Sequence, residues 1–333
     1  VVAAALDGAG CPARMVDART LVVTDEIHGA AAVRQDLTRR RLRDALLKRT
    51  DVAVVTGFIA ATEAGVTTTL GRNGSDLTAT LVGAALDAEA VEIWTDVDGV
   101  LSADPRDVPG AFVLPQLSVS EAIELAHFGA RVIHPATMEP AAARGLPVWI
   151  RNTSRPELAG SLIADNGDGI PGAITGLASL DRVALLTVEG SAMVGVPGSA
   201  ARLFGALAAA GVNILMISQG SSEHSICFVV EEGVCQAARR AIEGAFSPEL
   251  ERGTLLPVKI ADPVAIIAVV GQQMAGTPGL AGQVFGALGR HQINVLAIAQ
   301  GSSEINISLV VESTDRVSAL RSIHDAFFPR EGY

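Results

Sequence analysis

The chain has 333 residues, more than one hydrophobic core normally accommodates, so we expect two or three domains. Its apolar fraction is 49%, whereas aromatic residues make up only 4%, a composition typical of aliphatic α/β packing. The net charge of −11 argues against a nucleic-acid partner, because proteins of that class need a basic surface to displace counterions from phosphates.

One basic run, residues 39–41, lies beside Leu37, Leu42 and Leu46 at nearly helical spacing. This pattern favours a solvated helix face over a phosphate-binding patch. The three cysteines, Cys11, Cys227 and Cys235, are odd in number and show no Cys-x-x-Cys spacing. We therefore expect a reducing, cytoplasmic compartment.

Two uncharged stretches, 203–222 and 264–289, are as long as a membrane span. Both are interrupted by Gly with Asn or Gln, so we expect buried elements and no membrane partner. The histidines have no metal-ligand spacing, and no metal site is expected. The first five residues lack the basic flank of a signal peptide and there is no initiator Met, so we expect the chain to begin inside a domain.

The first half alternates β-branched apolar runs with amphipathic patterns, which predicts a mostly parallel sheet between helix layers. The predicted strands are 52–59, 91–95 and 146–150, and the predicted helices are 75–87, 122–128 and the stretch between Pro135 and Gly145. Ser75 is a candidate N-cap, and Ser118 with Glu121 matches a capping box. Trp94 and Trp149 fall in the strands and are expected in the core.

A run of small and polar residues at 164–172 marks the expected domain boundary. Beyond it the sequence repeats at a constant offset of 81 positions: Gln219-Gly-Ser-Ser-Glu returns at Gln300, and Phe204-Gly-Ala-Leu returns at Phe285. Each copy has the pattern strand, helix, strand, strand, helix, which is typical of a small ferredoxin-like βαββαβ unit.

The loop Gly71-Arg72-Asn73-Gly74-Ser75-Asp76 lies where a strand is followed by a helix. Backbone N–H groups and the positive end of that helix favour an anion there. Arg72 can grip a carboxylate with two hydrogen bonds, and Asp76 supplies the opposite charge. This combination suits a zwitterionic amino acid, although from the residues alone a structural turn is about as common.

Four stretches of the first half together resemble a known family. The stretch 67–76, together with 94–100, 104–106 and 128–137, closely resembles the aspartokinases, and the resemblance runs from about Cys11 to Phe328. It implies the amino-acid-kinase fold with its N-terminal part missing, ATP and Mg²⁺ as cosubstrates, and phosphorylation of the β-carboxylate of L-aspartate. The product would be 4-phospho-L-aspartate, on the first step towards lysine, threonine and methionine.

The resemblance also assigns roles. Arg72, Asn73, Gly74 and Ser75 would bind the substrate, with Arg72 and Asp76 as the catalytic residues. The nucleotide would contact the following positions: Thr95, Asp96, Leu101, Arg106, Arg131 and Val132. Two positions depart from the family: Leu101 stands where relatives often carry Tyr, and Arg131 where many carry Lys.

The family's Lys-Phe-Gly-Gly motif, whose lysine neutralises the transferring phosphoryl group, is not in this chain, and neither Lys48 nor Lys259 has that context. We expect the sequence to be a truncated part of an active parent. The carboxylate of aspartate is ionised at neutral pH and needs no general base. Catalysis should then consist of positioning and of neutralising negative charge.

Both repeats resemble ACT domains, most closely those of the threonine-regulated branch, including the kinase and regulatory part of bifunctional aspartokinase-homoserine dehydrogenases. The resemblance implies feedback regulation by L-threonine, a homodimer or higher homo-oligomer formed through the ACT domains, and a strand near 174–179 that joins the second copy. The expected effector-binding residues are Asn213, Ile217, Gln219, Asn294, Ile298 and Gln300. No Gly-x-Gly-x-x-Gly fingerprint of a dehydrogenase follows the second copy.

The expected organisation has four parts: a catalytic domain at 1–164, a linker and first ACT strand at 165–181, ACT domain 1 at 182–262 and ACT domain 2 at 263–328. The leading hypothesis is a threonine-regulated aspartate kinase. Two alternatives stay open: a non-catalytic amino-acid-sensing regulatory protein, and another acyl-phosphate-forming amino-acid kinase, acting for example on glutamate.

Overall fold

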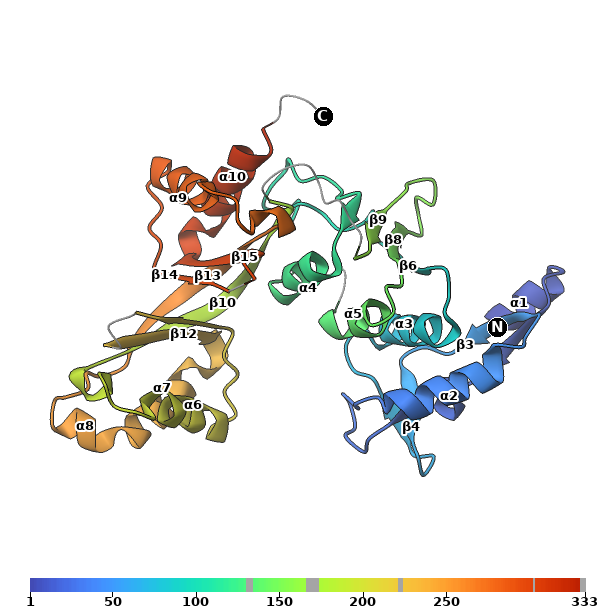
Figure 1. Ribbon diagram of the computed structural model, residues 1–333, viewed down its shortest axis with the longest axis horizontal. Coiled ribbons are helices and arrows are strands. Elements are labelled where there is room, and N and C mark those ends of the chain that lie inside the picture. The colour runs from blue at the N-terminus through green and yellow to red at the C-terminus, as the bar shows by residue number, and fades with distance from the viewer. Residues whose placement is uncertain (130–133, 166–173, 221–223, 302, 330–333) are drawn as a thin grey trace. The chain divides into compact units, whose positions relative to one another are not determined.

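The computed structural model describes residues 1–129, 134–165, 174–220, 224–301 and 303–329 (Figure 1). The chain forms two compact units. The first unit comprises Val1–Leu101 and Val113–Pro171, and the second comprises Ser102–Phe112 and Gly172–Tyr333. The sequence predicted one unbroken catalytic segment up to residue 164, whereas in the structure eleven of its residues, 102 to 112, belong to the second unit.

The first unit combines short helices with short, mostly parallel strand pairs. Its helices are α1 (Val2–Gly8), α2 (Gln35–Leu46), α3 (Gly74–Leu86), α4 (Val119–His127) and α5 (Pro135–Ala142). Its strands are β1 (Ala13–Val16), β2 (Val23–Thr24), β3 (Val52–Val55), β4 (Ile59–Thr62), β5 (Thr67–Thr69), β6 (Val91–Thr95), β7 (Gln116–Leu117), β8 (Val148–Asn152) and β9 (Ser161–Ile163). They form three sheets, in the orders β1-β3, β2-β4-β5 and β6-β8-β9-β7.

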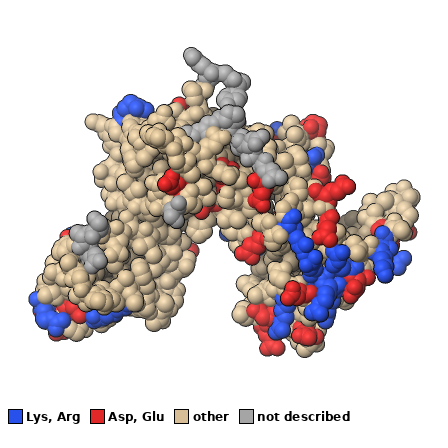
Figure 2. All heavy atoms as spheres, in the orientation of Figure 1, with Lys and Arg blue, Asp and Glu red and all other residues tan. Residues whose placement is uncertain are grey.

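The helix α2 carries the basic run, as predicted. Leu42 and Leu46 are buried in a core with Leu81 of α3, while Arg39 and Arg40 point to solvent. In Figure 2 the Lys and Arg atoms over this part of the first unit are interspersed with Asp and Glu atoms. The run is therefore the solvated face of an amphipathic helix.

Three local predictions for the first unit were wrong. The stretch 52–59 is not one strand, because β3 ends at Val55 and the backbone turns through Phe58, whose φ is +73°. Helix α3 begins at Gly74, so its N-cap position is Asn73, in the left-handed conformation, and Ser75 lies inside the helix, where its hydroxyl donates to the Asp76 carboxylate. Trp94 is 44% exposed, since it alternates with the buried Ile93 on β6.

The capping box at Ser118 was predicted correctly. The backbone N–H of Glu121 donates to Ser118 Oγ at 3.2 Å, and the backbone N–H of Ser118 donates back to Glu121 Oε2 at 2.9 Å. Both groups are buried, so this reciprocal pairing satisfies two donors at the start of α4 that the helix itself leaves unpaired.

The second unit is built on one six-stranded antiparallel sheet in the order β11-β12-β10-β13-β15-β14. Its strands are β10 (Gly176–Glu189), β11 (Met216–Gln219), β12 (Ser225–Glu231), β13 (Lys259–Val270), β14 (Ala297–Gln300) and β15 (Asn306–Glu312). Its helices are α6 (Ser199–Ala209), α7 (Cys235–Ala245), α8 (Ser247–Glu251), α9 (Leu280–Arg290) and α10 (Arg316–Phe327). We call residues 176–258 the first copy and residues 259–328 the second copy.

The two copies are interleaved through their first strands. The start of β10 pairs with β13, in the register Gly176 to Val270 through Leu180 to Ile266, and the later part of β10 pairs with β12. The early strand that the resemblance assigned to the second copy thus does join it. Each copy has its own buried core, with α6 and α7 over the first and α9 and α10 over the second (Figure 1).

Across the part of the chain that the structure describes, no helix combines the length and the apolar character needed to cross a bilayer.

Candidate functional site

The predicted substrate loop enters helix α3 through two left-handed residues. Gly71 has φ +76° and Asn73 has φ +55°, and the Gly74 N–H donates to the Gly71 carbonyl at 3.1 Å. A Cβ at Gly71 would lie 3.0 Å from the carbonyl oxygen of Gly29, so glycine is required there by both backbone conformation and space. The loop presents the N-terminus of a thirteen-residue helix, where unpaired N–H groups favour an anion.

The loop's polar side chains hold one another in place. Asn73 Nδ2 donates to one oxygen of the Asp76 carboxylate at 3.0 Å, and Ser75 Oγ donates to the other at 3.1 Å. Arg72 is exposed, and among the described residues it has no ion-pair partner. The structure therefore brings Arg72, Asn73, Gly74, Ser75 and Asp76 together and leaves a guanidinium available beside a positive helix end.

A second wall of this site was not predicted from the sequence. A Cβ at Gly57 would lie 3.1 Å from the Cα of Ser75, and one at Gly74 would lie 3.0 Å from Cδ2 of Phe58. Phe58 is 44% exposed and adopts a φ of +73°, which a bulky residue rarely adopts. The signal in the sequence was the Gly57-Phe58 pair between two apolar runs, which we had placed inside a single strand.

The predicted nucleotide residues of the first unit follow β6. The Thr95 hydroxyl donates to the Asp96 carboxylate at 3.2 Å, and the Thr95 carbonyl accepts from the Thr153 N–H at 2.8 Å. Asp98 accepts from Asn152 Nδ2 at 2.7 Å and is paired with Arg155. These contacts tie the β6 turn to the end of the neighbouring strand β8.

Ser161 fixes the far side of the same turn. Its hydroxyl accepts from the Val100 N–H at 2.9 Å and donates to the Leu114 carbonyl at 2.6 Å. Gly99 has φ +149°, and a Cβ there would lie 2.5 Å from Ser161 Oγ. Leu101 forms an isolated antiparallel β-bridge with Val113. The turn from 96 to 101 therefore ends where the chain pairs with the segment that returns at Val113.

The remaining nucleotide predictions lie elsewhere. Arg106 is in the second unit, where it donates to both carboxylate oxygens of Asp104 at 2.5 to 3.1 Å. The hydrogen bonds from Arg106 hold the pKa of Asp104 below its usual value of 3.8, despite partial burial. Arg131 and Val132 lie outside the described residues.

The predicted effector residues lie on and before two edge strands. Ile217 and Gln219 share one face of β11, and Ile298 and Gln300 share one face of β14. All four are exposed, and so are Asn213 and Asn294 in the preceding loops. The Ser218 hydroxyl donates to the Ile298 carbonyl at 2.7 Å, so the edge strands of the two copies meet and the two sets of residues are neighbours.

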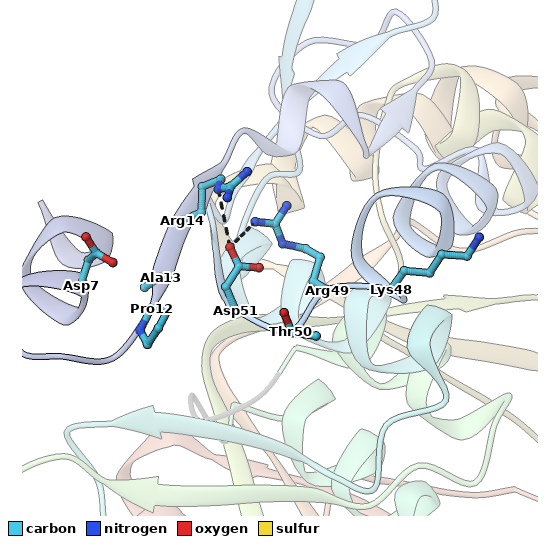
Figure 3. Close-up of a pocket in the computed structure, with 8 residues that line it drawn as sticks. All are labelled: Asp7, Pro12, Ala13, Arg14, Lys48, Arg49, Thr50 and Asp51. Atoms are coloured by element: carbon cyan, nitrogen blue, oxygen red, sulfur yellow. Dashed lines mark hydrogen bonds and ion pairs between the residues drawn. The ribbon is translucent and has the colours of Figure 1, made fainter.

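One cavity of about 400 Å³ lies near the start of the chain, between α1, β1 and the segment before β3. Figure 3 shows Arg14 and Arg49 directed at Asp51, with Lys48 pointing away from them. The Arg49–Asp51 distance is 2.7 Å, and this contact lowers the pKa of Asp51. None of the predicted site residues lines this cavity, and its arginines Arg14 and Arg49 are both paired with Asp51.

Two family models match the chain. Residues 1–152 match the amino acid kinase family, and residues 186–246 and 267–327 both match an ACT domain. The two ACT matches are offset by 81 positions, as the sequence repeat requires.

Individual relatives agree with these models. A maize protein described as bifunctional aspartokinase/homoserine dehydrogenase 1, chloroplastic, is 41% identical over 97% of this chain, which covers 36% of that protein. The structure of E. coli aspartokinase III in complex with aspartate and ADP has a TM-score of 0.79 at 28% identity, covering 96% of this chain and 71% of that one. The same enzyme with lysine and aspartate has a TM-score of 0.76 at 29% identity, covering 97% and 71%.

The chain spans about a third of the length of the bifunctional relatives that it matches. The kinase fold and the paired ACT fold are both present, as the sequence predicted.

Proposed function

Because this chain belongs to the aspartokinases that carry paired ACT domains, we propose that its first unit provides part of an aspartate kinase site. The reaction would transfer a phosphoryl group from ATP to the β-carboxylate of L-aspartate. The product would be 4-phospho-L-aspartate, on the first step towards lysine, threonine and methionine. The observation that carries this proposal is the exposed Arg72 beside the N-terminus of α3, next to the ordered Asp76 carboxylate.

Each charge of aspartate has a complementary group in this loop. The guanidinium of Arg72 can take a carboxylate with two parallel hydrogen bonds. The Asp76 carboxylate is oriented by Asn73 and Ser75 and offers its charge to the ammonium group. The N–H groups at the start of α3 provide further donors for an anion. We assign Arg72 and Asp76 as the catalytic residues, since they would hold the reacting molecule.

The proposed reaction requires that aspartate and ATP be held in position and that the negative charge of the phosphates be neutralised. The β-carboxylate is ionised at neutral pH, so no side chain has to remove a proton from it. Two anions have to approach each other, and fixed cationic groups lower the cost of that approach. We propose that the exposed guanidinium of Arg106 contacts the nucleotide, together with Thr95, Asp96, Leu101, Arg131 and Val132.

We propose that the nucleotide brings its own divalent ion to the site. Among the described residues, no group of three His, Cys, Asp or Glu side chains could hold a metal ion. Mg²⁺ fits the site as an ion carried by the nucleotide phosphates, which need only one or two protein carboxylates. When bound, it would neutralise charge on the phosphate oxygens.

Calorimetric titration of the chain with L-aspartate and with a non-hydrolysable ATP analogue plus Mg²⁺ tests the proposal. Arg72→Ala should weaken aspartate binding about ten- to hundredfold, the scale of a lost charge-assisted hydrogen-bond pair, and should leave nucleotide binding intact. Arg40→Ala is the control, since Arg40 is an exposed arginine of α2 in the same unit. Aspartate binding that is equally strong in the Arg72 variant would remove this residue from the site.

The alternatives give different titrations. Threonine binding without binding of aspartate or nucleotide would favour the non-catalytic amino-acid sensor. Preference for glutamate over aspartate would favour another acyl-phosphate-forming kinase of the same fold. On the longer parent protein, formation of aspartyl hydroxamate tests turnover directly.

We further propose that L-threonine is the feedback effector and binds where β11 and β14 meet. The support is geometric: Gln219 and Gln300 lie on neighbouring edge strands beside Ile217 and Ile298, with Asn213 and Asn294 before the strands. These apolar side chains are 45% and 44% exposed, which also suits pairing of ACT domains in a homodimer or higher homo-oligomer. Feedback of this kind needs a coupling free energy of about 1–3 kcal/mol.

Gln219→Ala should weaken threonine binding about tenfold while aspartate binding stays unchanged, because one hydrogen bond to the ligand is worth about that factor. Lysine is titrated in parallel, since it is the ligand named for E. coli aspartokinase III. Unchanged threonine affinity in Gln219→Ala, or tighter binding of lysine than of threonine, would contradict the assignment.

We keep the cytoplasm as the proposed compartment because Cys11, Cys227 and Cys235 are free thiols.

A further inference from the structure

The segment Ser102–Phe112 leaves the first unit and is built into the core of the second. Ala103 and Val108 are 3% and 2% exposed and belong to the same hydrophobic cluster as Leu309 and Ile323 of the second copy. The Ser102 carbonyl accepts from the Leu177 N–H at 2.7 Å, which extends the sheet hydrogen bonding to the segment. Its two ends are joined, because the Ser102 N–H donates to the Phe112 carbonyl at 2.9 Å. The segment is therefore a short closed loop.

Helix α10 holds the middle of this loop by charge. The guanidinium of Arg316 donates to both oxygens of Asp107, at 2.6 and 3.0 Å, and to Ser179 Oγ at 3.0 Å. Arg321 Nε donates to the carbonyl of Asp107 at 2.6 Å. The Arg316 and Asp107 side chains are only 20% and 15% exposed. A bidentate pair with this degree of burial fixes geometry far better than an exposed ion pair does.

The base of the loop is held by a buried histidine. Ser102 Oγ and His324 Nε2 share a hydrogen bond of 3.0 Å, and both residues are at most 2% exposed. The His324 ring also contacts Phe112 and Phe328, with centroids 6.2 and 4.8 Å away. The loop thus meets α10 at both its base and its middle.

The two copies differ at two of the three α10 residues that make these contacts. Position 316 corresponds to Cys235 and position 324 to Glu243, each offset by 81, whereas the core position Ile323 corresponds to Ile242. The core residue is the same in both copies, and Arg321 also has an equivalent, Arg240, in the first copy. The side chains that bind Asp107 and Ser102, Arg316 and His324, are present only in the second copy.

Between these two anchors lies Arg106, the arginine assigned to the nucleotide. It sits one residue before Asp107, its side chain is 71% exposed, and Asp104 orients it. The Asp107 and Val108 N–H groups donate back to the Asp104 carbonyl at 3.1 and 2.9 Å, so the backbone on either side of Arg106 forms a turn. Any motion of Asp107 would be passed to Arg106 through this turn.

We propose that Asp107 and Arg316 are positioning residues for the nucleotide: their ion pair holds Arg106 in its binding position, so the second ACT copy sets the affinity for ATP. This inference rests on the proposed function, in which Arg106 contacts the nucleotide. A loop that is already ordered loses little conformational freedom on binding, and release of the loop adds that cost to binding.

The test compares the chain with Arg316→Met, with the nearly isosteric Asp107→Asn and with the double variant. Affinity for the ATP analogue with Mg²⁺ should fall about tenfold in each single variant, and the double variant should be no weaker than either single one, because one interaction is lost. Aspartate affinity should stay unchanged. Arg316→Lys should recover part of the loss, since it keeps the charge without the fork.

Arg239→Met is the matched control. Arg239 forms an ion pair with Glu243 at 2.9 Å on α7, the helix of the first copy that corresponds to α10. Amide exchange measured by mass spectrometry should rise across residues 104–112 in the Arg316 and Asp107 variants and should not change in the Arg239 variant.

The outcomes separate the two proposals. A wild-type chain that binds no nucleotide overturns the proposed function and this role together. Normal nucleotide binding by the wild type, with no loss in a folded Arg316→Met or Asp107→Asn variant, overturns the positioning role alone. Parallel loss of aspartate and nucleotide affinity also overturns it, because general unfolding would then explain the effect. If Arg316→Met does not fold, Asp107→Asn decides the matter.

Discussion

The two copies in the second unit share their strand and helix order, but different parts of the chain complete their cores. The first copy is closed by residues that follow its own last helix, Leu255 and Val258, which are buried with Phe228. The second copy is closed by Ala103 and Val108, which come from the kinase half of the sequence. The two copies therefore share one fold, but the residues that close their cores come from different parts of the sequence.

Truncation of a large core residue at the same position in each copy should give the largest effect and should separate the copies. Phe228 and Leu309 are equivalent positions, offset by 81, and are 1% and 0% exposed. Phe228→Ala should cost about 3–5 kcal/mol and Leu309→Ala about 2–5 kcal/mol in free energy of unfolding, through lost burial and a cavity. Urea unfolding measures both values.

Amide exchange of the loop 102–112 should also distinguish the Leu309 and Phe228 variants. Leu309→Ala should raise exchange across 104–112, because Leu309 and Val108 belong to one cluster. Phe228→Ala should leave the exchange of the loop as it is. Equal loosening of the loop in both variants would mean that the two cores act as one cooperative unit, and the contrast between them would fail.

The next largest loss of stability is expected for Val108, which lies outside the sequence of both copies. Val108→Ala removes two buried methyl groups from the core of the second copy, so we expect a loss of about 1.5–3 kcal/mol in its unfolding free energy. Val196→Ala is the control, since Val196 is 51% exposed and should change stability by less than about 0.5 kcal/mol. A Val108 variant as stable as the control would show that the kinase segment is not part of that core.

The smallest expected effect is an acid dependence confined to the first copy. Arg202 lies over the Phe246 ring and donates to Glu249 at 2.8 and 3.0 Å, whereas the equivalent of Arg202 in the second copy is the uncharged Gln283. The hydrogen bonds from Arg202 hold the pKa of Glu249 below its usual value of 4.5. A carboxyl whose pKa falls on folding stabilises the protein above its usual value and loses that contribution as the pH falls through the lowered value.

Urea unfolding from about pH 6 to about pH 3 therefore tests the Arg202–Glu249 pair. The stability difference between wild type and Glu249→Gln should be largest near neutral pH and should shrink below 4.5, the usual value. A constant difference across this range would exclude the pair as the source.

Patterns that depend on local physics were predicted well. The strand 91–95 and the capping box at Ser118 could be predicted because periodicity and cap chemistry act over short distances in the sequence. The repeated modules could be predicted because the repeat is visible in the sequence itself. The split of 52–59 was not predicted, since an apolar run continues on both sides of Gly57-Phe58 and the positive φ of Phe58 is visible only in the structure. Trp94 was misplaced because its burial depends on what covers a sheet face, which strand pattern does not specify.

The candidate site shows the same division. The loop from Arg72 to Asp76 could be predicted as one group because its residues are consecutive and a helix follows them. Its second wall, from Gly57 and Phe58, could not, because it depends on a tertiary approach of two loops. The loop 102–112 was assigned to the kinase half by sequence order, while its partners Arg316 and His324 lie more than two hundred positions away.

The path of Ser102–Phe112 limits how this protein can be divided. An ACT-domain piece that begins near residue 172 would lack Ala103 and Val108 and would keep Arg316 without Asp107. The second copy would then expose the apolar surface that Ala103 and Val108 cover, and the guanidinium of Arg316 beside it would lack its carboxylate partner. We expect such a piece to aggregate. Exchange of the paired ACT domains between related enzymes would therefore have to move two separate pieces of sequence. A peptide with the sequence of 102–112 is the natural reagent for restoring the isolated ACT pair.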